Sequence, residues 1–122
     1  MSKTQENEWV TVGQAEDLVA GAGVGALVGG VQVALFWVPE LENGLFAVSN
    51  YCPFSKVHII ARGIIGDVAG EPVVASPMYK QHFSLLDGHC IEQPDVSLNC
   101  YAIRINGNDI QVAGRVAKAI AA

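Results

Sequence analysis

The fold of this chain depends on two stretches, AVSNYCPF at residues 47–54 and VVASPMYKQH at residues 73–82. Each stretch begins with a short apolar run and continues into a loop that contains a proline. Apolar runs of four to eight residues bounded by Gly, Pro or Asn are typical of β-strands. We therefore expect two strand-and-loop units in the middle of the chain.

The same pattern continues outward from both units and predicts an all-β chain. Gly29-Gly30 divides a Val-rich run into two halves, as the turn of a β-hairpin does. Residues 115–122 are predicted either to form a short C-terminal helix or to fray. The expected strands are 9–12, 27–28, 31–38, 45–48, 101–105 and 110–112, with short strands around Gly63, Gly66 and Gly70 and a turn or single helical turn at 14–18.

Length and composition predict one folded domain. The chain has 122 residues, of which 51% are hydrophobic and 16% charged. A chain of this length can bury a sizeable core without metal or disulfide support. No internal repeat or linker divides it, so we expect a single domain over residues 1–122, with residues 1–8 as a disordered tail.

Charge and cysteine content exclude several classes of protein. The net charge is −5 and the sequence has no block of Lys or Arg, which argues against nucleic acid as a partner. Three cysteines without regular spacing argue against a disulfide framework and favour a reducing compartment. The first eight residues have no apolar segment that resembles a secretory signal. We expect a cytoplasmic protein.

Residues 18–38 are long and apolar enough to be considered as a membrane span. Acidic residues flank the segment on both sides, and no Lys or Arg anchors its ends. Gly29-Gly30 also interrupts it. We therefore predict a hairpin here and no contact with a membrane.

The two loops and their surroundings resemble a Rieske-type iron–sulfur domain. That family binds a two-iron, two-sulfur cluster with Cys-x-His in one loop and Cys-x-x-His in a second loop. The resemblance extends from the Val-rich hairpin through both loops to Phe83-Ser84-Leu85, Gly88 and the terminal hairpin that begins at Tyr101. It implies a Rieske-like antiparallel β-sandwich or barrel.

The cluster ligands of the family are not conserved in this sequence at three of four positions. Cys52 matches the first cysteine, whereas Phe54, Ser76 and Tyr79 stand where the family has His, Cys and His. A phenyl ring has no lone pair to donate, and one thiolate does not hold an iron–sulfur cluster. The resemblance therefore implies a domain without a cluster, without a metal site and without catalytic residues, in which Cys52 is a small buried residue.

A cluster-free Rieske-like chain of this size resembles the small subunits of NAD(P)H-dependent assimilatory nitrite reductase. The resemblance implies a cytoplasmic accessory subunit that has no cofactor and is not catalytic by itself. Its partner is then a large subunit that carries FAD, an iron–sulfur cluster and sirohaem and reduces nitrite to ammonium. Two alternatives stay open: a Rieske-type ferredoxin that serves an oxygenase, and a free-standing domain that binds a small molecule.

Side chains around the two loops are the expected partner-binding surface. Aromatic residues and methionine suit interface anchors. The same rings equally suit a plug for the space that a cluster occupies in the family, and we expect Phe54 and Tyr79 to pack against each other or to share a buried cluster with Cys52. The expected partner-binding residues are Tyr51, Phe54, Met78, Tyr79 and His82.

Two further patterns carry little functional signal. Residues 21–26, GAGVGA, imitate a dinucleotide-binding fingerprint, but no helix-forming sequence follows them, so we expect a bend or bulge. His58, His82, and His89 with Cys90 lack the paired short spacings of structural zinc sites. No metal site is predicted from them.

Overall fold

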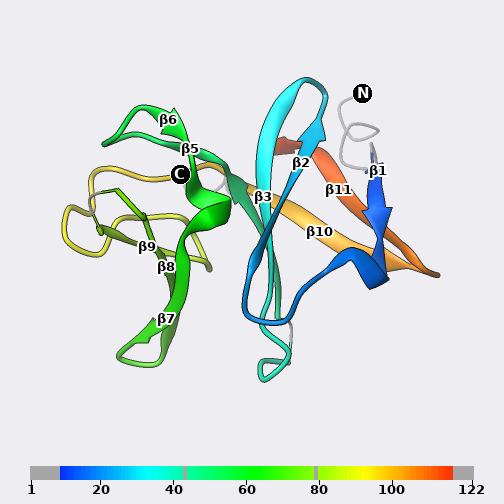
Figure 1. Ribbon diagram of the computed structural model, residues 1–122, viewed down its shortest axis with the longest axis horizontal. Coiled ribbons are helices and arrows are strands. Elements are labelled where there is room, and N and C mark those ends of the chain that lie inside the picture. The colour runs from blue at the N-terminus through cyan, green and yellow to red at the C-terminus, as the bar shows by residue number, and fades with distance from the viewer. Residues whose placement is uncertain (1–8, 43, 79, 117–122) are drawn as a thin grey trace, which may run out of the picture.

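The computed structural model describes residues 9–42, 44–78 and 80–116, and in these ranges the chain is all-β (Figure 1). Two short 3-10 turns, η2 (Ala15–Asp17) and η3 (Ile60–Arg62), interrupt the strands. The strands are β1 (Trp9–Gln14), β2 (Gly23–Val28), β3 (Val31–Trp37), β4 (Leu45–Ser49), β5 (Tyr51–Cys52), β6 (Val57–His58), β7 (Ile64–Val68), β8 (Glu71–Ala75), β9 (His82–Ser84), β10 (Cys100–Asn106) and β11 (Asp109–Val116).

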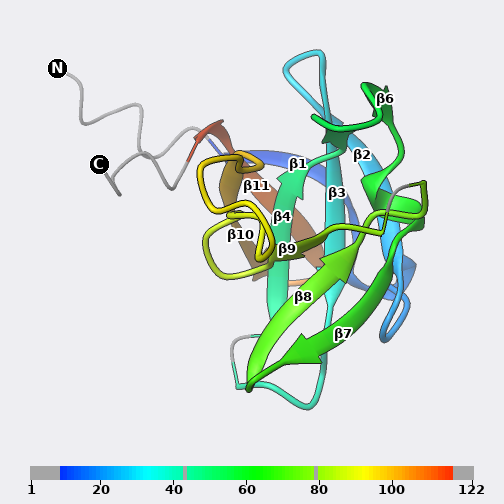
Figure 2. The same cartoon turned by 90° about the vertical axis from the view of Figure 1, so that its left-hand side faces the viewer.

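The strands form three antiparallel sheets. Six of them make one sheet in the order β1-β11-β10-β4-β3-β2, and its two edge strands, β1 and β2, contact each other, so that the sheet curls towards a barrel. A three-stranded sheet, β7-β8-β9, lies beside it, and β5-β6 form a two-stranded tip (Figures 1 and 2). The predicted antiparallel all-β architecture is confirmed.

The β2–β3 hairpin confirms the turn predicted at Gly29-Gly30. Both glycines have positive φ, 58° and 84°, as a type I′ turn requires, and Val28 pairs with Val31 across it. Residues 18–38, the candidate membrane span, are therefore mostly this hairpin, and no helix among the described residues is long and apolar enough to cross a bilayer.

The prediction of a bend or bulge at residues 21–26 is wrong for most of that stretch. β2 begins at Gly23 and pairs regularly with β3. A Cβ at Gly23 would lie 2.3 Å from the carbonyl oxygen of Ala61, so this glycine allows η3 to pack directly on the strand. Gly21 alone takes a turn conformation, with φ of 76°.

Strand β3 is buried on both faces and separates two core clusters. Its side chains alternate, because successive residues of a strand point to opposite faces. Val33 and Leu35 pack inside the curl of the six-stranded sheet, whereas Ala34 and Phe36 face the cluster shared with the three-stranded sheet. The cluster that contains Ala34 and Phe36 also contains Cys52, Phe83 and Cys90. It therefore lies beneath the loop that contains Cys52.

The predicted C-terminal helix is wrong at its start. Arg115 and Val116 belong to β11, which has hydrogen-bonding neighbours on both sides, β1 and β10. The pairing of Tyr101 with Val116 keeps the backbone extended to the end of the strand. The rest of that prediction, residues 117–122, and the predicted tail at residues 1–8 lie outside the described residues.

Candidate functional site

The fold brings the two loops together at one end of the molecule. Cys52 Sγ lies 3.5 Å from Ser76 Oγ, and both residues are buried. Both loops turn in the same way. The backbone N–H of Lys56 donates to the carbonyl of Cys52 at 2.7 Å, and that of Lys80 donates to the carbonyl of Ser76 at 2.9 Å. Both lysines have a left-handed backbone, with φ of 62° and 61°.

The surroundings of Cys52 favour its thiolate form. Burial raises the pKa of the thiol, but hydrogen bonds from Ser55, Ser76 and the backbone of Phe54 outweigh burial and lower the pKa below its ordinary value. The backbone N–H of Ser55 lies 3.5 Å from Sγ. Because Cys52 is fully buried, this polar environment stabilises the loop and does not expose a nucleophile.

Phe54 is a plug between the loops and the core. Its ring lies 5.9 Å from the ring of Phe83, tilted by 42°, and the side chain packs on the same cluster as Cys52. Of the two roles expected for Phe54, the structure supports the plug. The expected ring contact between Phe54 and Tyr79 involves a residue outside the described ones.

Other side chains of the tip are exposed. Tyr51 is 40% exposed and packs edge-to-face on His58, with ring centroids 5.2 Å apart. Met78, in the second loop, is 53% exposed, and Val57 of β6 is also exposed. We call Tyr51, Val57 and Met78 the tip surface. Its three side chains are exposed, and Val57 is a member that the sequence did not identify.

His82 is hydrogen-bonded to Glu92, a residue that the sequence analysis did not identify. Its ring Nδ1 lies 2.6 Å from Glu92 Oε2, and its backbone N–H donates to Glu92 Oε1 at 2.9 Å. Partial burial raises the pKa of Glu92, but the hydrogen bonds from His82 dominate and lower that pKa to about 2. His82 is therefore half-exposed and held by Glu92.

The described donor atoms of the two loops do not fit an iron–sulfur cluster. Such a cluster takes two thiolates and two imidazoles in Rieske domains. Here one thiol contacts one hydroxyl at 3.5 Å, and the phenyl ring of Phe54 packs into the core at a third position. The described atoms of the two loops therefore do not supply the ligand set of such a cluster.

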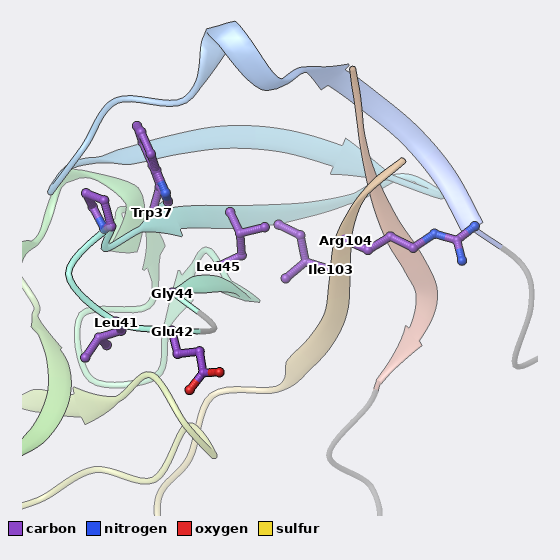
Figure 3. Close-up of a pocket in the computed structure, with 8 residues that line it drawn as sticks. Trp37, Leu41, Glu42, Gly44, Leu45, Ile103 and Arg104 are labelled. Atoms are coloured by element: carbon purple, nitrogen blue, oxygen red, sulfur yellow. The ribbon is translucent and has the colours of Figure 1, made fainter. Parts of the chain in front are cut away.

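A cavity of about 530 Å³ lies at the other end of the six-stranded sheet, near the β3–β4 loop (Figure 3). Trp37, Leu45 and Ile103 line it, and its charged lining residues are Glu42 and Arg104. The guanidinium of Arg104 points away towards β1, where it lies 4.1 Å from the Trp9 ring, and its Nε donates to Gln111 at 2.8 Å. These groups do not converge as a catalytic site would.

Comparison with known proteins identifies the family of this chain. Residues 8–113 match the model of the Rieske-like [2Fe-2S] domain family. The nitrite reductase (NADH) small subunit of Salmonella typhimurium is 39% identical over 108 residues, which cover 88% of this chain and 99% of that protein. The chain belongs to the Rieske-like family of nitrite reductase small subunits.

Two further relatives of this nitrite reductase small-subunit chain are informative. A solved structure from Mycobacterium tuberculosis, described as a candidate NADH-dependent nitrite reductase small subunit, is 43% identical, has a TM-score of 0.81, and aligns over 89% of this chain and 96% of that one. The nitrite reductase [NAD(P)H] large subunit of Klebsiella oxytoca is 29% identical over 107 residues, 88% of this chain and 11% of that protein. In Klebsiella, a similar module is thus part of the large subunit itself.

Proposed function

We propose that this chain is the accessory small subunit of a cytoplasmic NAD(P)H-dependent nitrite reductase and that it acts by binding the catalytic large subunit. The observation that carries the proposal is the similarity to the Salmonella small subunit over 99% of that protein's length. The Klebsiella large subunit supports the choice of partner. A module that is covalently joined to a large subunit in one protein is expected to bind one when it is a separate chain.

The chemistry belongs to the large subunit in this proposal. Hydride transfer from NAD(P)H and electron transfer to nitrite need cofactors, and the family resemblance assigns FAD, an iron–sulfur cluster and sirohaem to the partner. The described part of this chain offers one thiol at the loop tip, Cys52, and it is buried. The isolated chain is therefore expected not to reduce nitrite.

The tip surface is the proposed docking site. Tyr51 and Val57 are exposed on the β5–β6 hairpin and Met78 on the β8–β9 loop, and the buried contact of Cys52 with Ser76 joins the two segments. Aromatic residues and methionine are enriched at the cores of interfaces, which favours Tyr51 and Met78 as anchors. Phe54, His82 and Tyr79 are the remaining partner-binding residues of the proposal.

Truncation of the tip tests the docking proposal. Tyr51→Ala and Met78→Ala should each weaken binding of the purified large subunit by about 2 kcal/mol, or roughly 30-fold, as central anchors do. Biolayer interferometry with immobilised large subunit measures the affinity. The control is Leu41→Ala, because Leu41 is similarly exposed, at 39%, in the β3–β4 loop at the opposite end of the molecule (Figure 2).

This experiment tests two claims separately: that the tip surface is the docking site, and that the chain binds a large subunit at all. Binding that is lost with the tip variants and kept with Leu41→Ala supports the proposed surface. Binding that all three variants keep means that the tip is not the docking surface, whereas no binding by the unmodified chain contradicts the accessory-subunit proposal itself.

Iron content distinguishes an accessory subunit from a Rieske-type ferredoxin. A ferredoxin needs a bound cluster, and a cluster needs four good ligands. Protein purified without oxygen should contain far less than one iron atom per chain. Stoichiometric iron together with acid-labile sulfide would overturn the cluster-free assignment.

A further inference from the structure

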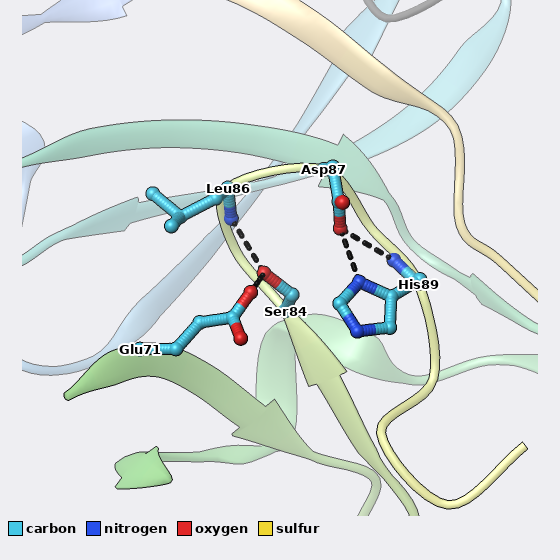
Figure 4. A network of polar contacts seen from close by, with 5 residues as sticks. All are labelled: Glu71, Ser84, Leu86, Asp87 and His89. Carbon is cyan, nitrogen blue, oxygen red and sulfur yellow. Dashed lines mark hydrogen bonds and ion pairs between the residues drawn. The ribbon is translucent and has the colours of Figure 1, made fainter. Parts of the chain in front are cut away.

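We propose that Glu71, Asp87 and His89 form a binding site for a divalent transition metal ion, with Zn²⁺ as the ion that fits the donors best. One ligand atom of each residue lies within 4.8 Å of the other two. Glu71 opens β8, while Asp87 and His89 belong to the turn that follows β9 (Figure 4). The site is separate from the two loops of the tip and independent of the proposed function.

The donor set distinguishes this group from an ordinary acidic cluster. Two carboxylates and one imidazole combine oxygen and nitrogen donors, which suits zinc and its neighbours and does not suit Mg²⁺, an ion that prefers oxygen donors only. Three protein ligands with a remaining position for water are the usual number at an open zinc site. Asp87 is exposed and His89 half-buried, so the ion can enter from solvent.

A buried serine holds Glu71 in place. The hydroxyl of Ser84 donates to Glu71 Oε2 at 2.5 Å and accepts the backbone N–H of Leu86 at 3.1 Å (Figure 4). Ser84 is fully buried and pairs with Val73, two residues after Glu71 on the same strand. Hydrogen bonds of this kind orient metal ligands and reduce the entropy lost when the ion binds.

The turn that carries Asp87 and His89 is equally constrained. Asp87 Oδ1 accepts the backbone N–H of His89 at 3.1 Å, and the backbone N–H of Ser84 donates to the carbonyl of His89 at 2.8 Å. Gly88 between them has φ of 85°, and a Cβ there would lie 2.2 Å from the carbonyl oxygen of Leu98. The backbone positions of both ligands are therefore defined before an ion binds.

The present donor distances differ from those of a coordinated site by about 1 Å. Ligand atoms at 2.0–2.2 Å from zinc lie about 3.4 Å from one another in a tetrahedral site. His89 Nδ1 and Asp87 Oδ1 are now 2.5 Å apart, joined by a hydrogen bond, and must separate by about 1 Å. A donor oxygen of Glu71 must approach the others by at most about 1.4 Å, the difference between 4.8 Å and 3.4 Å.

Metal titration of the full-length chain tests the site. After treatment with chelator and dialysis, isothermal calorimetry should show saturable binding of one Zn²⁺ per chain that a tenfold excess of Mg²⁺ does not displace. Glu71→Gln and His89→Gln should each weaken Zn²⁺ binding at least tenfold, the range found when a metal ligand or its support is lost. His58→Gln is the matched control, because His58 lies in the tip and not in this group.

A measurement on the unmodified chain tests the site even if one of the variants does not fold. In NMR spectra of the imidazole nitrogens, Zn²⁺ should shift the resonances of His89 and leave those of His58 unchanged. The proposal is overturned if no Zn²⁺ binds, if the shifted histidine is His58 or His82, or if Glu71→Gln and His89→Gln bind Zn²⁺ as tightly as the control.

Discussion

Substitution of Phe54 by alanine removes the ring that fills the space between the two loops and the core. In the structure this ring contacts Phe83, which is fully buried, and packs on the cluster that contains Cys52. The loss has two parts: apolar area that returns to water, and a cavity that rigid neighbours such as Phe83 cannot fill.

The structure sets the size of the effect. Complete burial would make Phe→Ala cost about 3–5 kcal/mol. Phe54 is only partly buried, which reduces the expected destabilisation to about 3 kcal/mol. Of this amount, roughly 0.5–1.5 kcal/mol belongs to the aromatic contact with Phe83.

Urea unfolding followed by tryptophan fluorescence measures the free energy of unfolding. The midpoint should fall while the slope stays constant, because the unfolded state exposes nearly the same surface. A double-mutant cycle of Phe54→Ala with Phe83→Leu should give a coupling of about 0.5–1.5 kcal/mol. Tyr51→Ala, an exposed ring in the same loop, is the control and should change stability by about 0.5 kcal/mol or less.

Two results would refute this account of the plug. A destabilisation by Phe54→Ala that equals that of Tyr51→Ala would mean that the ring is not packed. Strict additivity in the cycle would mean that Phe54 and Phe83 do not share an interaction.

Two further predictions concern packing and charge. Gly23→Ala should destabilise the protein by about 1–3 kcal/mol, because the added Cβ meets the carbonyl oxygen of Ala61 at 2.3 Å. Gly25→Ala is the control, because a Cβ at this position of the same strand meets nothing within 4 Å. Equal losses of unfolding free energy for the two variants in urea would contradict the close approach. The folded-state pKa of Glu92 is about 2, below its ordinary 4.5, so the stability it contributes is present above pH 4.5 and is lost as the pH falls towards 2. The stability advantage of the unmodified chain over Glu92→Gln should shrink over that range, and an advantage that is constant from pH 6 to 2 would exclude this role for Glu92.

Local sequence signals predicted most of the strands correctly. The β2–β3 hairpin follows from Gly29-Gly30, because two adjacent residues with positive φ are needed in a type I′ turn and glycine adopts that conformation without strain. The β10–β11 hairpin corresponds to the strands predicted at 101–105 and 110–112. The predicted C-terminal helix is wrong at Arg115 and Val116, because the pairing of Val116 with Tyr101 of β10 keeps the backbone extended there and outweighs a weak local preference.

The sequence by itself determined the family and the all-β class, because these depend on residue types and on spacing along one chain. The tertiary structure decided which side chains meet. Phe54 lies on Phe83, His82 on Glu92, and Cys52 on Ser76. The group of Glu71, Asp87 and His89 likewise spans two elements and has no signature in spacing. Such contacts depend on strand register and on the docking of one sheet beside another, and those are set by packing of the whole core and not by any local run of residues.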